Sequence, residues 1–223
     1  MFLSRFSLNR NSPLNALATL LNPADPNAAA DAHHKLIWTL FGNDEKDQGR
    51  DFLFRSDGRG GFITLSSRTP VANDLVTSPE TLPFNPKLAE GQRLTFMMRA
   101  NATVRRRDAN GISRRCDVVM DMLHALPRAE RAANRERITI EAGRDWLRRQ
   151  GEKSGFRLEQ CLVDNHSTIT IGRGRGKKAT FSLMDLSGQI TVTDPEVFRT
   201  AHASGFGHAK AWGCGLMLIR ATA

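Results

Sequence analysis

Cysteine is scarce in this chain of 223 residues. Its three cysteines, Cys116, Cys161 and Cys214, lie far apart, and none forms the Cys-x-x-Cys pair of a structural zinc site. A sparse and odd set also argues against a secreted protein held together by disulfide bonds. We therefore expect neither a metal ion nor another cofactor.

Long apolar runs are missing as well. No segment approaches the roughly 20 apolar residues that a membrane-spanning helix needs. The N-terminus alternates polar and apolar residues and lacks the continuous apolar stretch of a signal peptide. These absences predict a cytoplasmic protein without a membrane partner.

Acidic residues are outnumbered by basic ones, 23 Asp and Glu against 32 Lys and Arg, which gives a formal net charge of +9. Such a balance favours a polyanionic partner, and clustering of the charge favours nucleic acid over mere solubility. We expect both clusters at loop tips, where arginine forks bind phosphate oxygens; a flexible, solvated loop is the plainer alternative. The first cluster contains Arg105, Arg106, Arg107, Arg114 and Arg115, and the second contains Arg173, Arg175, Lys177 and Lys178 between glycines.

The first part of the sequence has the pattern strand, helix, strand, strand, which fits a ferredoxin-like α+β unit. The predicted elements are a strand at 2–8, a short helix at 13–21, a helix from the N-cap Asn27 to about Phe41 with its stop at Gly42, and a hairpin of strands 51–55 and 61–66; the apolar stretch 71–76 is left unassigned.

The second part also has an α+β pattern. A turn-rich stretch at 78–91 separates the two, so we predict one domain at 1–88 and another at 89–223, both ferredoxin-like and built on antiparallel sheets. The predicted elements are a strand at 94–100, a long polar segment, a helix at 140–153, strands at 156–163, 168–171, 180–186 and 189–192, a helix capped by Asp194 that runs to about Ser204, and a strand at 216–219.

A glycine-rich segment lies near the C-terminus, from Gly205 to Gly215, and it includes Gly207, Gly213 and Lys210. Glycines permit a positive φ and a close approach of the backbone. Exposed backbone N–H groups in such a segment could bind a phosphate. A tight connection between a helix and a strand is the alternative reading.

The chain contains no tyrosine, and its candidates for acid–base catalysis are six histidines. Adjacent His33 and His34 cannot both face one metal ion from a regular helix. With about 100° per residue, His33 points to the helix's apolar face, whereas His34 lies on the flank of Asp31, where it can face a ligand. A Ser/His/Asp triad stays open, although no nucleophile elbow is present. Without metal ligands, RNA cleavage would use acid–base chemistry on the substrate's own 2′-hydroxyl, for which histidine is suited.

Several motifs together resemble those of the CRISPR repeat-RNA-processing endoribonucleases of the CasE (Cse) family. The motifs are Met1-Phe2-Leu3-Ser4, the helix segment from His34 to Phe41, Arg50-Asp51-Phe52-Leu53-Phe54, Arg99-Ala100-Asn101, and Gly205-Phe206-Gly207 followed after five residues by Gly213-Cys214-Gly215. The resemblance implies two RRM-related, ferredoxin-like domains. It also implies metal-independent cleavage of CRISPR precursor RNA within each repeat, at the base of a stem-loop, giving guide RNA with 5′-hydroxyl and 2′,3′-cyclic phosphate ends. The implied partners are the repeat hairpin and other subunits of Cascade.

Our first hypothesis makes His34 the general acid or base, while Lys210 and one or more of the loop arginines hold the scissile phosphate and stabilise its added charge. The basic residues of both clusters, with Lys210 and the glycines of the glycine-rich segment, bind RNA. One position departs from the family, because Asp31 stands where a tyrosine is common. A carboxylate there could orient His34 and so replace the tyrosine, or it could merely cap the helix. The alternative function is a non-catalytic RNA-binding subunit of a ribonucleoprotein complex.

Overall fold

The computed structural model describes residues 1–11, 17–42, 50–107, 110–172 and 178–222. The chain divides into two compact units. The first unit joins Met1–Lys87 with Ile169–Thr180 and Ala209–Leu216, and the second comprises Leu88–Thr168, Phe181–His208 and Met217–Ala223. Each unit therefore contains chain from both halves of the sequence.

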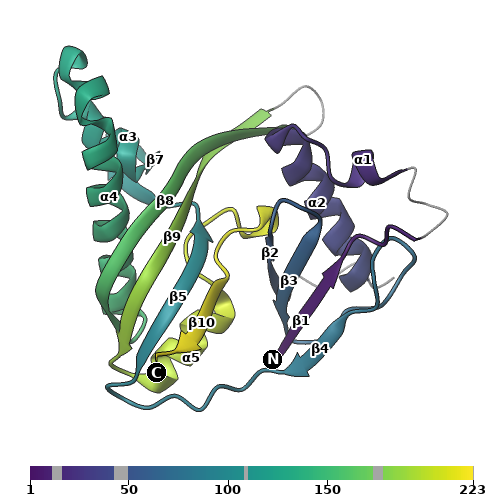
Figure 1. Ribbon diagram of the computed structural model, residues 1–223. Helices are drawn as coiled ribbons and strands as arrows, with labels where there is room; N and C mark the ends of the chain where they lie inside the picture. The colour runs from purple at the N-terminus through teal and green to yellow at the C-terminus, as the bar shows by residue number, and fades with distance from the viewer. Residues whose placement is uncertain (12–16, 43–49, 108–109, 173–177, 223) are drawn as a thin grey trace. The chain divides into compact units, whose positions relative to one another are not determined.

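The first unit contains a four-stranded sheet with the strand order β2-β3-β1-β4 (Figure 1). Strand β1 pairs antiparallel with β3 and β4, and β2 pairs antiparallel with β3. This is the strand order of a ferredoxin-like unit, but residues 67–79, all of them described, contain no second helix. Its elements are β1 (Phe2–Ser7), α1 (Ala18–Leu21), α2 (Pro26–Phe41), β2 (Phe52–Ser56), β3 (Gly61–Ser66) and β4 (Glu80–Pro83).

The core of the first unit lies between α2 and the sheet. Leu36, Ile37 and Leu40 are at spacings that place them on one face of α2, and all are at most 1% exposed. They pack against strand side chains that include Phe6, Phe52, Phe54 and Phe62. This packing fixes the rotation of α2, and with it the direction of every polar side chain on the helix.

The start of α2 differs from the prediction. Asp25 is the N-cap, because its carboxylate accepts a hydrogen bond from the Ala28 amide at 2.8 Å and Pro26 suits the first turn. Asn27 instead accepts a hydrogen bond from the Thr170 amide at 2.6 Å. The helix stops at Gly42 as predicted. The stretch 71–76 forms only an isolated bridge between Val76 and Leu8. Residues 13–16 of the short helix predicted at 13–21 lie outside the described residues.

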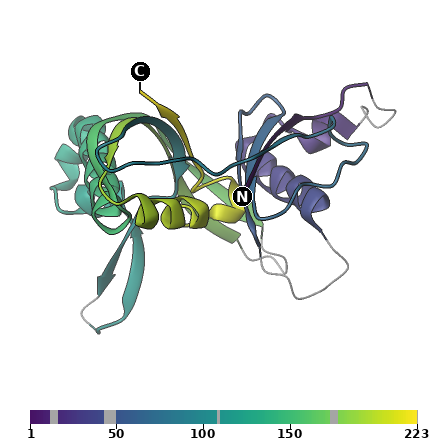
Figure 2. The same ribbon diagram turned by 90° about the horizontal axis from the view of Figure 1, so that it is seen from below.

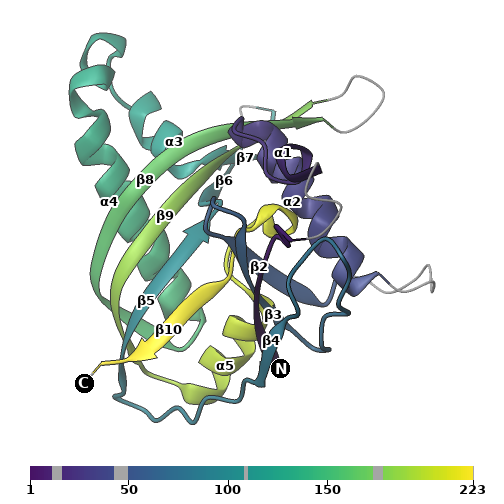
Figure 3. The same cartoon turned by 45° about the vertical axis from the view of Figure 1, so that its right-hand side comes forward.

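The second unit has the sheet order β10-β5-β9-β8 (Figure 3). Without its insertion the element order is β5-α4-β8-β9-α5-β10, the ferredoxin-like succession βαββαβ. Helices α4 and α5 contribute Trp146, Leu147 and Phe198 to a core that the sheet completes with residues such as Phe96 and Met98. The elements are β5 (Arg93–Ala100), α4 (Arg131–Lys153), β8 (Phe156–Gly172), β9 (Lys178–Val192), α5 (Pro195–Ser204) and β10 (Met217–Ala221).

Three expectations for the second unit need correction. The four short strands are two long ones, β8 and β9. Helix α4 begins nine residues before the predicted start, and surface pairs such as Arg137 with Glu141 at 3.0 Å support its charged first part. The predicted cap of α5 is confirmed, since Asp194 accepts from the amides of Glu196 and Val197.

The third correction concerns the polar segment after β5. It forms a hairpin of β6 (Thr103–Arg107) and β7 (Ser113–Asp117), then α3 (Val118–His124) and a short 3-10 helix, η2 (Arg128–Glu130). Figure 2 shows the hairpin projecting from the second unit. The arginines of the first cluster therefore lie along two paired strands and not at a loop tip.

Candidate active site and nucleic-acid interface

His34 lies on α2 in the first unit, with its ring held on two sides. Its Nδ1 is 2.8 Å from the carbonyl oxygen of Ala211. The ring of Trp212 stacks on the imidazole, with 5.4 Å between centroids and 29° between planes. A carbonyl can only accept, so Nδ1 carries a proton and donates it to Ala211. Proton exchange with a substrate is therefore left to Nε2.

The neighbouring His33 has a different environment. It is only 7% exposed, its Nε2 is 2.9 Å from Oδ1 of Asn22, and its ring meets Phe62 edge to face. The sequence prediction that His33 packs in the interior while His34 lies to one side agrees with these positions. The catalytic role of His34 stays a prediction.

Asp31 lies one turn before Lys35 on the same helix. Its carboxylate pairs with the Lys35 ammonium at 2.6 Å, and the Lys35 side chain is exposed while that of Asp31 is partly exposed. This carboxylate therefore has a lysine as its ion-pair partner. Support of His34 by Asp31 remains a hypothesis.

Lys210 begins the 3-10 helix η3 (Lys210–Trp212), which also carries Ala211. Burial, and after it the positive charge of Arg50, lowers the pKa of the Lys210 ammonium. Burial lowers the pKa of Arg50 as well, and its Nε has no hydrogen-bond partner among the described residues. Lys210 and Arg50 are close enough to interact electrostatically, and Lys210 is next in sequence to Ala211, which binds His34. Two such cations favour the binding of an anion.

The sequence analysis assigned no role to Arg50, which it named only within a family motif, or to Trp212. Arg50 precedes β2, and Trp212 lies within the glycine-rich segment, where the glycines and Lys210 were the evident candidates. No periodic pattern connects either residue to α2. Only the chain path brings them to His34 and Lys210.

The glycine-rich segment makes two tight turns around η3. Ala209 has φ of 52° and Gly213 has φ of 78°, so left-handed residues stand on either side of η3. A Cβ on Gly213 would lie 3.3 Å from the Phe54 ring, and one on Gly207 would lie 3.0 Å from the Asn101 carbonyl oxygen. Gly205 and Gly215 also have positive φ. Gly213 thus allows the close approach to Phe54 that helps to place Ala211 and Trp212 in the first unit, while phosphate binding by the glycines stays a prediction.

The β6–β7 hairpin carries the first basic cluster in the second unit. Arg105 pairs directly with Arg115, and Arg106 pairs with Arg114. Like charges opposite each other destabilise a strand pair, and a bound polyanion would relieve that repulsion. Side chains alternate between faces, so Arg105, Arg107 and Arg115 share one face, whereas Arg106 is on the other and binds Asp121 at 2.7 Å.

The second basic cluster is described in part. Lys178 is the exposed first residue of β9. Arg173, Arg175 and Lys177 lie outside the described residues.

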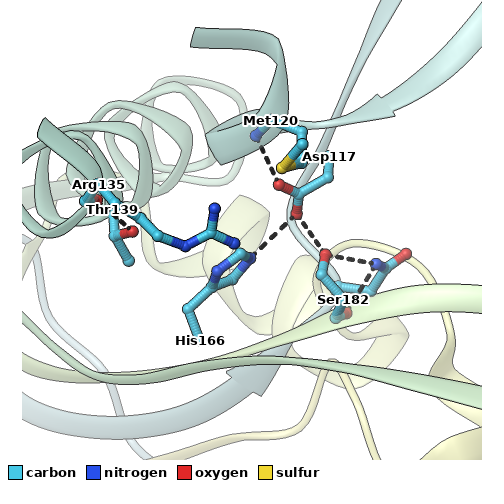
Figure 4. A network of polar contacts seen from close by, with 7 residues as sticks. Asp117, Met120, Arg135, Thr139, His166 and Ser182 are labelled. Carbon is cyan, nitrogen blue, oxygen red and sulfur yellow. Dashed lines mark hydrogen bonds and ion pairs between the residues drawn. The ribbon is translucent and has the colours of Figure 1, made fainter. Parts of the chain in front are cut away.

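A serine, a histidine and an aspartate do come together in the second unit, but not as a hydrolytic triad (Figure 4). Both the Ser182 hydroxyl and Nε2 of His166 lie against the same carboxylate, Asp117. In a triad the histidine stands between the other two and takes the serine proton. Here the proton of Ser182 points to the carboxylate, so this cluster does not activate a nucleophile.

Metal-binding and membrane-spanning features are absent from the described part of the chain. Within the described ranges, no three His, Cys, Asp or Glu residues gather so that they could hold a metal ion. In that same part of the chain, no helix has both the length and the apolar character to cross a membrane.

Known proteins resemble this chain in sequence and in fold. A family described as CRISPR associated protein matches residues 1–221, and the chain belongs to that family. It is 28% identical over 198 residues to the CRISPR system Cascade subunit CasE of Escherichia coli K12, covering 83% of this chain and 89% of the relative. It is also 28% identical over 151 residues to the CRISPR-associated endoribonuclease Cse3 of Thermus thermophilus, covering 61% of this chain and 60% of that relative.

Solved structures confirm the architecture. The CRISPR endoribonuclease Cse3 bound to a 19-nucleotide RNA superposes with a TM-score of 0.67 at 24% identity, covering 98% of both chains. Cas6e of Escherichia coli K-12 superposes with a TM-score of 0.64 at 23% identity over the full length of both. The predicted fold, two tandem ferredoxin-like domains with antiparallel sheets, is confirmed.

Proposed function

We propose that this chain is an endoribonuclease of the CasE kind that binds and cleaves CRISPR precursor RNA within the repeat, at the base of a stem-loop. The observation that carries the proposal is the His34 ring, fixed by the Ala211 carbonyl and Trp212 on the same short helix as Lys210. The names of its relatives CasE and Cse3 support the activity and the substrate.

The chemistry that fits this site is transesterification. The 2′-oxygen of the nucleotide before the cut attacks the adjacent phosphorus and the bond from phosphorus to the 5′-oxygen breaks. The 2′-hydroxyl loses its proton and the departing 5′-oxygen gains one, which yields a 2′,3′-cyclic phosphate and a 5′-hydroxyl. Nε2 of His34 either takes the first proton or gives the second, since Nδ1 is engaged with Ala211.

Lys210 and Arg50 act on the phosphate. The attack adds negative charge to the phosphate oxygens, and nearby cations that are already in place stabilise it. Burial of both groups strengthens their effect because less water screens the charge. We assign them to the scissile phosphate, and we assign Asp31 to the support of His34.

The β6–β7 hairpin supplies RNA binding. An A-form stem is recognised mainly through its shape and phosphates, and arginines on one face of a projecting hairpin suit that task. The basic residues 173–178 and the glycine-rich segment are proposed to contribute further contacts. The relative's name as a Cascade subunit supports other Cascade subunits as partners.

Replacing His34 with Ala tests the catalytic assignment. Cleavage of a labelled repeat hairpin is expected to fall by at least ~10²-fold, the lower range for a general acid or base, while the gel shift of the uncleaved hairpin stays near that of the wild type. A Lys210→Ala variant is expected to slow cleavage with a smaller effect on binding. Wild-type cleavage by the His34 variant would refute the assignment.

The same gel separates the alternatives. If the wild-type protein shifts the RNA hairpin on the gel but yields no cleavage product, the chain is a non-catalytic RNA-binding subunit instead. Cleavage is expected to continue in EDTA and to leave ends that a cyclic-phosphate-specific ligase accepts. Loss of cleavage in EDTA, restored by a divalent cation, would overturn acid–base chemistry without a metal.

A further inference from the structure

Asp117 is the centre of a buried polar cluster in the second unit (Figure 4). It lies where β7 ends and α3 begins, and its carboxylate accepts from the Met120 amide at 2.8 Å. It also accepts from Nε2 of His166 on β8, at 3.3 Å, and from the hydroxyl of Ser182 on β9. The exposed fractions of the Asp117 and His166 side chains are 16% and 8%.

The charge of this carboxylate is maintained by its donors. Burial works against the charged form, but hydrogen bonds from His166, Ser182 and the Met120 amide outweigh it and hold the pKa of Asp117 below its usual value. A carboxylate with several donors is held in one place. Asp117 therefore ties the end of β7 to β8 and β9.

Ser182 also holds the other end of the hairpin. Its carbonyl oxygen accepts from Nδ2 of Asn101 at 2.8 Å, and Asn101 lies between β5 and β6. Asn101 is 6% exposed and Ser182 is 7% exposed. One residue of β9 therefore binds both ends of the inserted hairpin, Asn101 before β6 and Asp117 at the end of β7.

A two-stranded hairpin alone is at best marginally stable, and its direction depends on how its ends are anchored. This hairpin carries opposed pairs of arginines that repel each other. The direction of the hairpin must therefore be fixed by an anchor at its base. The hydrogen bonds of Ser182, which lies on β9, supply that anchor.

We propose that Ser182, Asp117 and Asn101 form a clamp that sets the direction of the β6–β7 hairpin and thereby the affinity for an RNA stem. The proposal rests on the proposed function. These are positioning residues: they act through the arginines and touch neither the RNA nor the reacting phosphate.

Two substitutions test the clamp, Ser182→Ala and Asp117→Asn. Asparagine retains the shape of the side chain and caps helices as well as aspartate does, so only the charge and its two side-chain bonds are weakened. In single-turnover cleavage of a repeat hairpin, the half-saturating protein concentration is expected to rise about tenfold, equal to ~1.4 kcal/mol. The rate at saturation is expected to stay within about twofold of the wild type.

The matched controls are Asp164→Asn and Ser187→Ala. Ser187 on β9 donates to Asp164 on β8 at 2.9 Å, which is also a bond from a serine of β9 to an aspartate, but it is exposed and does not involve the hairpin. These controls are expected to change neither quantity. Ser182→Thr, which keeps the hydroxyl, is expected to restore affinity to within about threefold of the wild type.

Hydrogen exchange on the protein alone gives the second readout. Amides in 103–117 are expected to exchange faster in the Ser182→Ala and Asp117→Asn variants, and the amides of β5 and α4 are expected to stay protected. A general loss of folding would raise exchange everywhere, and it would raise the half-saturating total protein concentration in inverse proportion to the folded fraction. Either that pattern, or unchanged exchange in 103–117, overturns the clamp.

The two proposals fail separately. A wild-type protein that neither binds nor cleaves the hairpin refutes the proposed function, and hydrogen exchange in 103–117 still decides whether the clamp exists. If the wild type cleaves but the clamp variants keep their half-saturating concentration, the clamp is refuted and the proposed function stands.

Discussion

His33 and His34 are neighbours in the sequence but differ in their surroundings. His33 binds Asn22 and packs on Phe62, whereas His34 donates to Ala211 and stacks on Trp212. The rotation of α2, fixed by its buried face, turns one ring inward and the other to the glycine-rich segment. At the residue scale, the phase of the helix thus decides which histidine packs inside and which faces the glycine-rich segment.

Trp212 is expected to position His34 for catalysis. Replacing it with Leu removes the stacked ring and should lower the saturating single-turnover rate about two- to tenfold, which corresponds to an aromatic pair of ~0.5–1.5 kcal/mol. The affinity for RNA should change less than the rate. Long-range nitrogen–proton spectra of the imidazole report which nitrogen carries the proton, and they should show less of the Nδ1–H form.

Trp212→Phe is the matched control, because phenylalanine keeps an aromatic face. It should retain most of the rate and the Nδ1–H form. If the leucine and phenylalanine variants both behave as the wild type, stacking does not position His34.

At the scale of elements, the two faces of the β6–β7 hairpin are expected to differ in RNA binding. Replacing Arg105, Arg107 or Arg115 with Ala should weaken binding and reduce the slope of log affinity against log salt concentration by about one each. Arg106→Ala should reduce it less, since Arg106 is paired with Asp121 on the other face. Binding titrations at several salt concentrations measure these slopes; an equal loss for Arg106→Ala would contradict the assignment of faces.

At the scale of the whole molecule, stability is expected to fall in acid in two steps. Burial lowers the pKa of His202, which is 5% exposed and lies 2.7 Å from the Met217 carbonyl oxygen. As the pH falls, His202 therefore takes up a proton at a higher pH in the unfolded chain than in the folded one. The free energy of unfolding thus falls as the pH drops below about 6.5. The pKa values of Asp51, Asp117 and Asp121 are also lowered, so their contribution is present above about pH 4 and is lost below it.

Denaturant unfolding at pH 7.5 and at pH 5.5 tests the first step. The free energy of unfolding of the wild type is expected to fall from pH 7.5 to pH 5.5. That of His202→Gln should fall less, because glutamine does not titrate. His124→Gln, at an exposed position, serves as the control. Equal losses in the wild type and the His202 variant would rule out His202 as the cause.

Much of the fold could be predicted from local signals. Alternation predicted β1 and the β2–β3 hairpin, and the cap at Asp194 predicted the start of α5, because these patterns act over a few residues. The charged first part of α4 and the full lengths of β8 and β9 were missed, since partners distant in the sequence decide how far a strand or helix continues. The hairpin of β6 and β7 was read as loop because its arginines are unusual in paired strands.

The sequence by itself determined the net positive charge, the helix that carries the two histidines and the direction in which each points, because periodicity and composition are local properties. Only the tertiary structure decided what the polar side chains contact. The Ala211 carbonyl lies 177 positions from His34, the charge of Arg50 acts with burial to lower the pKa of Lys210, and Ser182 binds both ends of the hairpin. Such contacts depend on the path of the whole chain, since no pattern of neighbouring residues encodes which distant group arrives.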